Sequence, residues 1–206
     1  MQIRLAAAIP LILLSAFVIS AACTTGGSPP IAPAGTVQSP AAQPADAVLA
    51  PAAAGTFSLT VDSLTPGAVL PDLYTCKGTG TSPPVSWKGT PPETKSLVLI
   101  IEDPDAPKGV FTHWLVYNIP PGDGTIAGGQ TRGKTLDDGA QQGEGSSGSR
   151  GYYPACPPVG STHRYIFRLY ASDQYFPLPT ADRAAIDNAL AGHTLAKTAF
   201  VTTFTL

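Results

Sequence analysis

The chain has 206 residues, of which 13% are charged, and a formal net charge of −2 at pH 7. Nucleic acid is excluded as an expected partner, because no run of lysine or arginine occurs and binding it starts from a basic patch that neutralises phosphates. This length allows one domain with a tail or two small domains, and the sharp difference in composition between the two ends favours the first.

Residues 1–22 have the features of an export signal. Arg4 gives a weakly positive start, an apolar run occupies residues 5–19, and small residues precede Cys23. A cleaved signal peptide and an uncleaved anchor are both open, although the run is short for a membrane-spanning helix. The small residues before Cys23 are also similar to the bacterial lipobox, whose cysteine carries lipid. We expect an exported envelope protein, anchored to the periplasmic or extracellular face of a membrane by lipid, such as palmitate, on Cys23.

Residues 24–55 consist mainly of proline, alanine, glycine, serine and threonine, with almost no charge and no aromatic residue. Such a segment cannot bury enough apolar surface to offset its conformational entropy. We therefore expect residues 23–55 to be a disordered, semi-extended tether between the lipidated cysteine and a folded domain at residues 56–206.

Alternating or continuous apolar residues predict six strands in this domain. They are expected at residues 57–61, 85–87, 96–102, 113–119, 164–171 and 195–206. Residues 96–102 (SLVLIIE) are almost wholly apolar, which is typical of a strand buried on both faces at the centre of a sheet. On the following strand, period-two alternation places His113 on the same face as Leu115 and Tyr117.

One helix is predicted near the C-terminus. Thr180 is expected to be its N-cap, Asp182 suits its first turn, and Gly192 suits its end. Residues 122–151 are rich in glycine and almost without apolar residues, so a long loop is expected there. Many strands with one or two short helices indicate a mostly β domain, either a sandwich or a sheet-rich α+β fold.

Two aspartates flank Pro104 directly after the central strand. Proline fixes φ and disfavours helix at the preceding residue, so Asp103 and Asp105 are expected on a stiff turn at the sheet edge. An Asp-Pro turn whose carboxylates cap backbone amides is the structural alternative. His113 follows after a short connection, and adjacent strands can bring such residues side by side.

His163, Arg164 and Tyr165 open a later strand. Alternation points His163 and Tyr165 to one face and Arg164 to the other. Arg164 is expected to pair with Asp103 or Asp105, because a carboxylate at a buried edge needs a partner.

Metal binding and nucleophilic catalysis are the chemical alternatives for these side chains. Zinc or manganese could bind aspartate and imidazole, but no tight ligand spacing occurs, so we predict no metal site. No Gly-x-Ser-x-Gly motif is present, and no nucleotide-binding loop indicates a cofactor. Cys156 and His163 could form a Cys–His pair, unless a disulfide removes the thiol.

Cys76 and Cys156 are the two cysteines of the domain. Export would place them in an oxidising compartment, where two remaining cysteines often pair. We expect a Cys76–Cys156 disulfide, with two free buried thiols as the alternative. The bond would close a long loop and tie the early part of the domain to the loop before His163.

Four segments together resemble one protein family. They are YTCKGTGTSPPVSW (74–87), SLVLIIEDPDAP (96–107), HWLVYNIP (113–120) and CPPVGSTHRYIFRLYA (156–171). In this order they resemble the phosphatidylethanolamine-binding proteins, in particular the bacterial branch often called Raf-kinase-inhibitor-like proteins. The resemblance covers nearly all of residues 56–206. One departure is Pro154, in a loop where many relatives carry Gly-Pro before the Cys-Pro-Pro.

This resemblance implies a β-sandwich-like domain with a few short peripheral helices. It also implies a small pocket that binds phosphate-like anions or phospholipid head groups, and a protein partner that is regulated or inhibited. The ligand-binding residues it implies are Asp103, Asp105, His113, Pro157, His163 and Tyr165, with Arg164 in a structural supporting position. We therefore expect a binding protein rather than an enzyme. The alternative is a hydrolase-type enzyme in which Asp103 and His163 act as base and acid.

Overall fold

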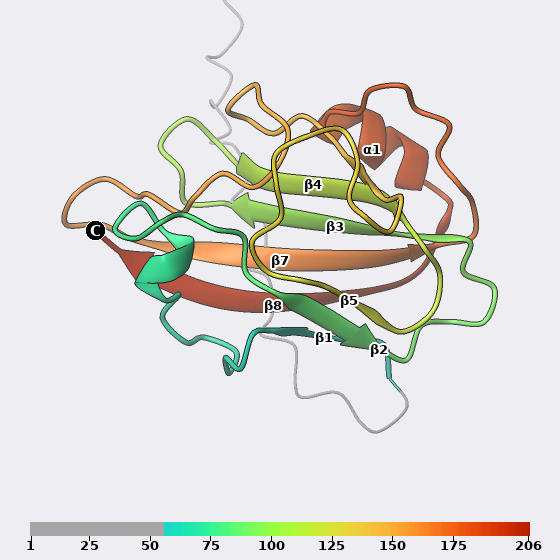
Figure 1. Ribbon diagram of the computed structural model, residues 1–206, viewed down its shortest axis with the longest axis horizontal. Helices are drawn as coiled ribbons and strands as arrows, with labels where there is room; N and C mark the ends of the chain where they lie inside the picture. Colours follow the sequence, from blue (N-terminus) through green and yellow to red (C-terminus); the bar gives the residue numbers. More distant parts are fainter. Residues whose placement is uncertain (1–55) are drawn as a thin grey trace, which may run out of the picture. The chain divides into compact units, whose positions relative to one another are not determined.

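The computed structural model describes residues 56–206, in which two antiparallel sheets are stacked (Figure 1). The smaller sheet has the order β1 (Ser58–Val61), β2 (Val85–Lys88), β5 (Gly124–Ile126). The larger has the order β6 (Gln141–Gln142), β4 (Phe111–Ile119), β3 (Ser96–Asp103), β7 (Thr162–Ser172), β8 (Thr194–Thr205). The predicted mostly β sandwich is confirmed. The export signal, Cys23 and the tether lie outside the described residues.

The apolar run at residues 96–102 forms the middle of β3, the central strand of the larger sheet. All eight residues of β3 are buried. The prediction of a strand covered on both faces is therefore confirmed. The smaller sheet covers one face, and the other carries the helix α1 (Arg183–Leu190).

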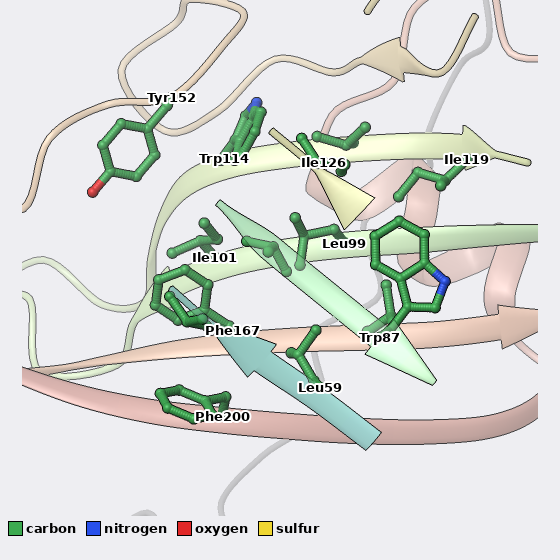
Figure 2. Close-up of a cluster of buried hydrophobic side chains, with 14 of the residues drawn as sticks. Leu59, Trp87, Leu99, Ile101, Trp114, Ile119, Ile126, Tyr152, Phe167 and Phe200 are labelled. Carbon is green, nitrogen blue, oxygen red and sulfur yellow. The ribbon is translucent and has the colours of Figure 1, made fainter. Parts of the chain in front are cut away.

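The main core lies between the two sheets. Figure 2 shows its side chains entering from both layers, including Leu59 from β1, Trp87 from β2, Leu99 and Ile101 from β3, Phe167 from β7 and Phe200 from β8. Burial of each such side chain contributes about 1.5–3 kcal/mol, so this packing fixes the sheets on which the polar residues stand.

A second cluster lies under α1 on the opposite face of the larger sheet. Ile186 and Leu190 pack there against Val98 and Ile100 of β3. At the end of this face the buried Glu102 accepts hydrogen bonds from Arg168 of β7, at 2.5 Å, and from Arg183 of α1. This pairing supplies the partners that a buried carboxylate requires.

The helix begins later than the sequence suggested. Asp182, not Thr180, is the N-cap, because its carboxylate accepts the backbone N–H of Ala185 at 2.8 Å. The prediction of Thr180 as the N-cap was wrong. Gly192, with φ of +78°, follows the C-cap Ala191, as expected of a residue that ends a helix.

Two further expectations are corrected by the strand pairing. Residues 122–151 are not loop throughout, since β5 and β6 both lie within them. His113 does not share the face of Leu115 and Tyr117, which pack under α1. Its ring instead lies 5.3 Å from that of Tyr165, which belongs to the core between the sheets.

A β-bulge explains the position of His113. Ile101 pairs with Trp114, whereas the next residue, Glu102, pairs with Thr112, so His113 is the extra residue on β4. A bulge changes the direction of a side chain and is frequent beside functional sites.

No helix within residues 56–206 is both long enough and apolar enough to cross a membrane.

Candidate functional site

A cavity of about 420 Å³ opens at one end of the larger sheet. The end of β3 meets the starts of β4 and β7 there, because β3 is antiparallel to both. The lining residues are Asp103, Ala106, Pro107, Phe111, His113, Tyr153, Pro154, Cys156, Pro157, Pro158 and His163. Four of the predicted site residues thus share one cavity: Asp103, His113, Pro157 and His163.

Asp103 and His163 form a buried pair at this cavity. Nδ1 of His163 donates to Oδ2 of Asp103 at 2.7 Å, and the two residues are 6% and 4% exposed. The other carboxylate oxygen accepts the backbone N–H of Asp105 at 2.8 Å. Because the carboxylate holds the proton on Nδ1, the second ring nitrogen of His163 is the one available to a ligand.

His113 is fixed by the backbone of Tyr153. Its Nδ1 donates to the Tyr153 carbonyl at 2.8 Å, and Tyr153 N–H donates back to the carbonyl of His113 at 2.8 Å. A carbonyl only accepts, so Nδ1 carries the proton and Nε2 is left for a ligand. Burial lowers the pKa of His113 below its ordinary value, and the nearby Asp103 partly opposes this.

Tyr165 lies beside the cavity without lining it. The residue is 1% exposed, and its hydroxyl has no hydrogen-bond partner among residues 56–206. Burial raises the pKa of Tyr165 far above its ordinary value, and Asp103 and Asp105 add to the effect. Its O–H therefore stays protonated, and a buried donor of this kind favours an incoming acceptor.

Asp105 lies outside the cavity lining and pairs with Arg164. The Arg164 guanidinium donates to both carboxylate oxygens, at 2.7 and 2.9 Å, and its backbone N–H donates at 2.9 Å. These hydrogen bonds hold the pKa of Asp105 below its usual range. The pair joins the turn after β3 to the start of β7, which is a supporting position.

The expected disulfide is present. Cys76 and Cys156 are bonded, with Cα atoms 5.4 Å apart and 80 positions apart in the sequence. Cys156 therefore has no free thiol for a Cys–His pair. No serine or threonine lines the cavity either, so the hydrolase alternative gains no support. Within residues 56–206 no group of three acidic, histidine or cysteine side chains could hold a metal ion.

Several lining residues were not predicted from the sequence. The most prominent are Phe111, whose ring lies 4.7 Å from that of His113, and Tyr153, at 6.2 Å. Phe111 stands two positions before His113, but nothing in a single sequence distinguishes it from a core aromatic. Tyr153 stands shortly before Cys156 but 40 positions after His113 in the sequence, and only folding brings it to His113.

Comparison with known proteins identifies the family of this chain. The family described as phosphatidylethanolamine-binding protein matches residues 60–205, which is most of the chain. The chain belongs to the phosphatidylethanolamine-binding protein family.

Individual relatives agree with this membership. A UPF0098 protein of Methanothermobacter thermautotrophicus is 47% identical over 61% of this chain and 83% of its own length. A UPF0098 protein of Chlamydia muridarum is 38% identical over 71% of this chain and 97% of its own length. LppC of Mycobacterium tuberculosis, named as a candidate lipoprotein, is 40% identical over 55% of this chain and 54% of its own length.

Two crystal structures share the fold. CT736 of Chlamydia trachomatis, described as a candidate homologue of the phosphatidylethanolamine-binding proteins, is 35% identical, with a TM-score of 0.67. The match covers 74% of this chain and 99% of CT736. YbcL of Escherichia coli, described as a member of the mammalian family, is 30% identical, with a TM-score of 0.67 and coverage of 73% and 98%.

Proposed function

We propose that this chain is an exported, lipid-anchored binding protein whose cavity holds a phosphate-like anion or the head group of a phospholipid. In this role it binds rather than transforms its ligand, and it regulates or inhibits a partner protein outside the cytoplasm. Membership of a family named for binding supports the first part. The lipobox-like residues before Cys23 and the similarity to LppC support the anchor.

The observation that carries the proposal is the set of uncommitted polar groups around the cavity. Both histidines use Nδ1 within the protein, which leaves Nε2 of His113 and of His163 for a ligand. The ring of Tyr165 lies 5.3 Å from that of His113, and its hydroxyl has no hydrogen-bond partner within residues 56–206. An imidazolium and a phenol both donate hydrogen bonds, so together they suit an anion with several oxygens.

The cavity walls make this binding depend on protonation. Pro154, Pro157 and Pro158 have no backbone N–H, so the wall offers few amide donors to an anion. The buried carboxylate of Asp103 accepts a hydrogen bond from Nδ1 of His163 but repels a bare anion. We therefore expect an anion to bind together with a proton, and more tightly as the pH falls from 7.5 to 5.5.

Calorimetric titration of the purified chain with phosphate, phosphoethanolamine and acetate tests the proposal. We expect the two phosphates to bind more tightly than acetate, because they offer more acceptor oxygens. His163→Gln should weaken the binding of phosphate about tenfold or more, the equivalent of a lost charge-assisted hydrogen bond. His193→Gln is the matched control, since His193 pairs with Asp173 on the surface, away from the cavity lining.

Absence of heat with both phosphates at pH 5.5 and 7.5 would rule the proposal out. Equal loss of phosphate affinity in His193→Gln and His163→Gln would also contradict it, because the loss would then not arise at the cavity.

A further inference from the structure

A solvent-exposed disulfide forms part of the cavity wall. Cys156 lines the cavity, and both Cys156 and its partner Cys76 are exposed. Exposed disulfides are the ones open to exchange with external thiols, whereas structural disulfides are usually resistant to reduction. Opening of this bond would therefore act directly on one wall of the cavity.

The wall segment, residues 152–158, is held on one side by the segment that carries Cys76. Tyr152 donates its hydroxyl hydrogen to the carbonyl of Tyr74 at 2.7 Å, and Cys76 N–H donates to the carbonyl of Ala155 at 3.0 Å. The second of these belongs to a parallel β-bridge between Thr75 and Ala155, which pairs the two segments beside the disulfide. Without the covalent bond, the wall would depend on these hydrogen bonds and on packing.

On its other side the same wall segment holds His113. Tyr153, three positions before Cys156, exchanges two hydrogen bonds with His113, both of 2.8 Å. One of them fixes the ring proton on Nδ1 and so directs Nε2 to the ligand. The disulfide is thus connected to a ligand-binding nitrogen through a few residues of one segment.

We propose that the Cys76–Cys156 disulfide is a redox-controlled positioning element of the cavity, whose reduction by a dithiol releases the wall segment and weakens the binding of the anion. The ligand in this inference rests on the proposed function. The partner that it adds is a dithiol reductant, which would approach from solvent, because both cysteines are exposed residues.

Reduction of this bond proceeds by thiol–disulfide exchange. A thiolate of the dithiol attacks one sulfur of the disulfide, a mixed disulfide forms, and the other cysteine leaves as a thiolate. The second thiol of the reductant then attacks the mixed disulfide. The reductant ends as a disulfide, while Cys76 and Cys156 become thiols and gain two electrons and two protons.

Release of the wall acts on the site through Tyr153. The Tyr153 carbonyl no longer holds Nδ1 of His113 in place, and Pro157 and Pro158 can leave the cavity lining. We expect the affinity for phosphate to fall about tenfold, which corresponds to the loss of roughly one positioned hydrogen bond.

The test compares the full chain in its oxidised form and after treatment with dithiothreitol, using phosphate as the ligand at pH 6. The Cys76→Ser/Cys156→Ser double variant is the matched control. Oxidised protein should bind phosphate about tenfold more tightly than reduced protein or the double variant, the difference expected for one positioned hydrogen bond. Dithiothreitol should change nothing in the double variant.

A second measurement does not need the ligand. The imidazole ¹⁵N signals of His113 should change on reduction, whereas those of His193, which is outside the cavity lining, should not. If oxidised protein binds no phosphate, the proposed function fails while these signals still test the inference.

Three results would overturn it. The first is equal phosphate affinity in oxidised and reduced protein. The second is an unchanged His113 signal on reduction. The third is global unfolding of the reduced chain, seen as loss of the indole signal of the buried Trp114, because the bond would then hold the fold and not the site.

Discussion

At the scale of single residues, the least satisfied group in the site is the hydroxyl of Tyr165. It is buried and has no hydrogen-bond partner in the described part of the chain, whereas the equally buried Tyr117 donates to the carbonyl of Leu178 at 3.1 Å. A buried donor without a partner costs about 1–3 kcal/mol, so its presence beside the cavity favours a functional role over a stabilising one.

Replacement of these two tyrosines by phenylalanine separates the two roles. Tyr165→Phe should leave the free energy of unfolding unchanged or higher, and should weaken phosphate binding about five- to tenfold through the loss of one donor. Tyr117→Phe should lower the free energy of unfolding by about 1 kcal/mol and leave binding unchanged. Chemical denaturation and calorimetry measure both; a fall in stability for Tyr165→Phe with intact binding would contradict this assignment.

Protonation of His113 should make the stability of the folded chain depend on pH. Burial lowers its pKa in the folded chain below the ordinary 6.5, so the unfolded chain takes up the proton first as the pH falls through 6.5. Stability in the absence of anion should therefore decrease below that pH. Asp103 opposes the effect and His163 adds to it, since their charges raise and lower the pKa of His113 respectively.

Urea denaturation at several values between pH 7.5 and 5.5 checks this dependence. His113→Asn keeps a donor for the Tyr153 carbonyl but does not titrate, so its stability should fall less steeply with decreasing pH than that of the natural chain. Identical slopes for the two proteins would show that His113 is not the group responsible.

At the scale of elements, the periodicity of apolar residues predicted where the strands lie, but not the direction of every side chain on them. Residues 96–102 form a central buried strand because continuous apolar character is incompatible with a solvated face. The direction of His113 was predicted wrongly, because the bulge arises from pairing between β3 and β4 and leaves no local signal in β4.

The start of helix α1 could likewise not be decided from the sequence alone. Both Thr180 and Asp182 are good N-cap residues, and only the docking of α1 on the larger sheet decides between them. Asp182→Ala should therefore lower the free energy of unfolding by about 1 kcal/mol, as loss of an N-cap does. Thr180→Ala should change it by less than about 0.5 kcal/mol, as expected of an exposed residue. Thermal denaturation distinguishes the two, and a larger effect at Thr180 would contradict the observed start of the helix.

The residues of the candidate site that belong to short sequence motifs could be predicted. Asp103, His113, Pro157 and His163 were predicted and share the cavity. Phe111 and Tyr153 were not, because a single sequence does not distinguish an aromatic residue of the core from one of a binding wall. Asp105 was expected with the ligand, but its carboxylate is occupied by Arg164.

At the scale of the whole molecule, the proposed lipid anchor would keep the cavity at a membrane, outside the cytoplasm. Cys23 is expected to carry lipid, and one acyl chain gives only marginal attachment, so several chains are needed for stable anchoring. In a bacterium that processes lipoproteins, the full chain should take up labelled palmitate and sediment with membranes. Cys23→Ser should remove the label and release the protein; unchanged sedimentation would show that lipid on Cys23 is not the anchor.

In the proposed site, an anion binds between the second ring nitrogens of His113 and His163. The chain contains three histidines, and the third, His193, lies outside the cavity lining, so it serves as an internal reference. Imidazole ¹⁵N spectra of the full chain at pH 7, recorded with increasing phosphate, would detect this binding at each ring. We expect Nε2 of His113 and Nε2 of His163 to become protonated in parallel while His193 is unchanged. Spectra of His113 and His163 that do not respond to phosphate, or that respond only as His193 does, would contradict it.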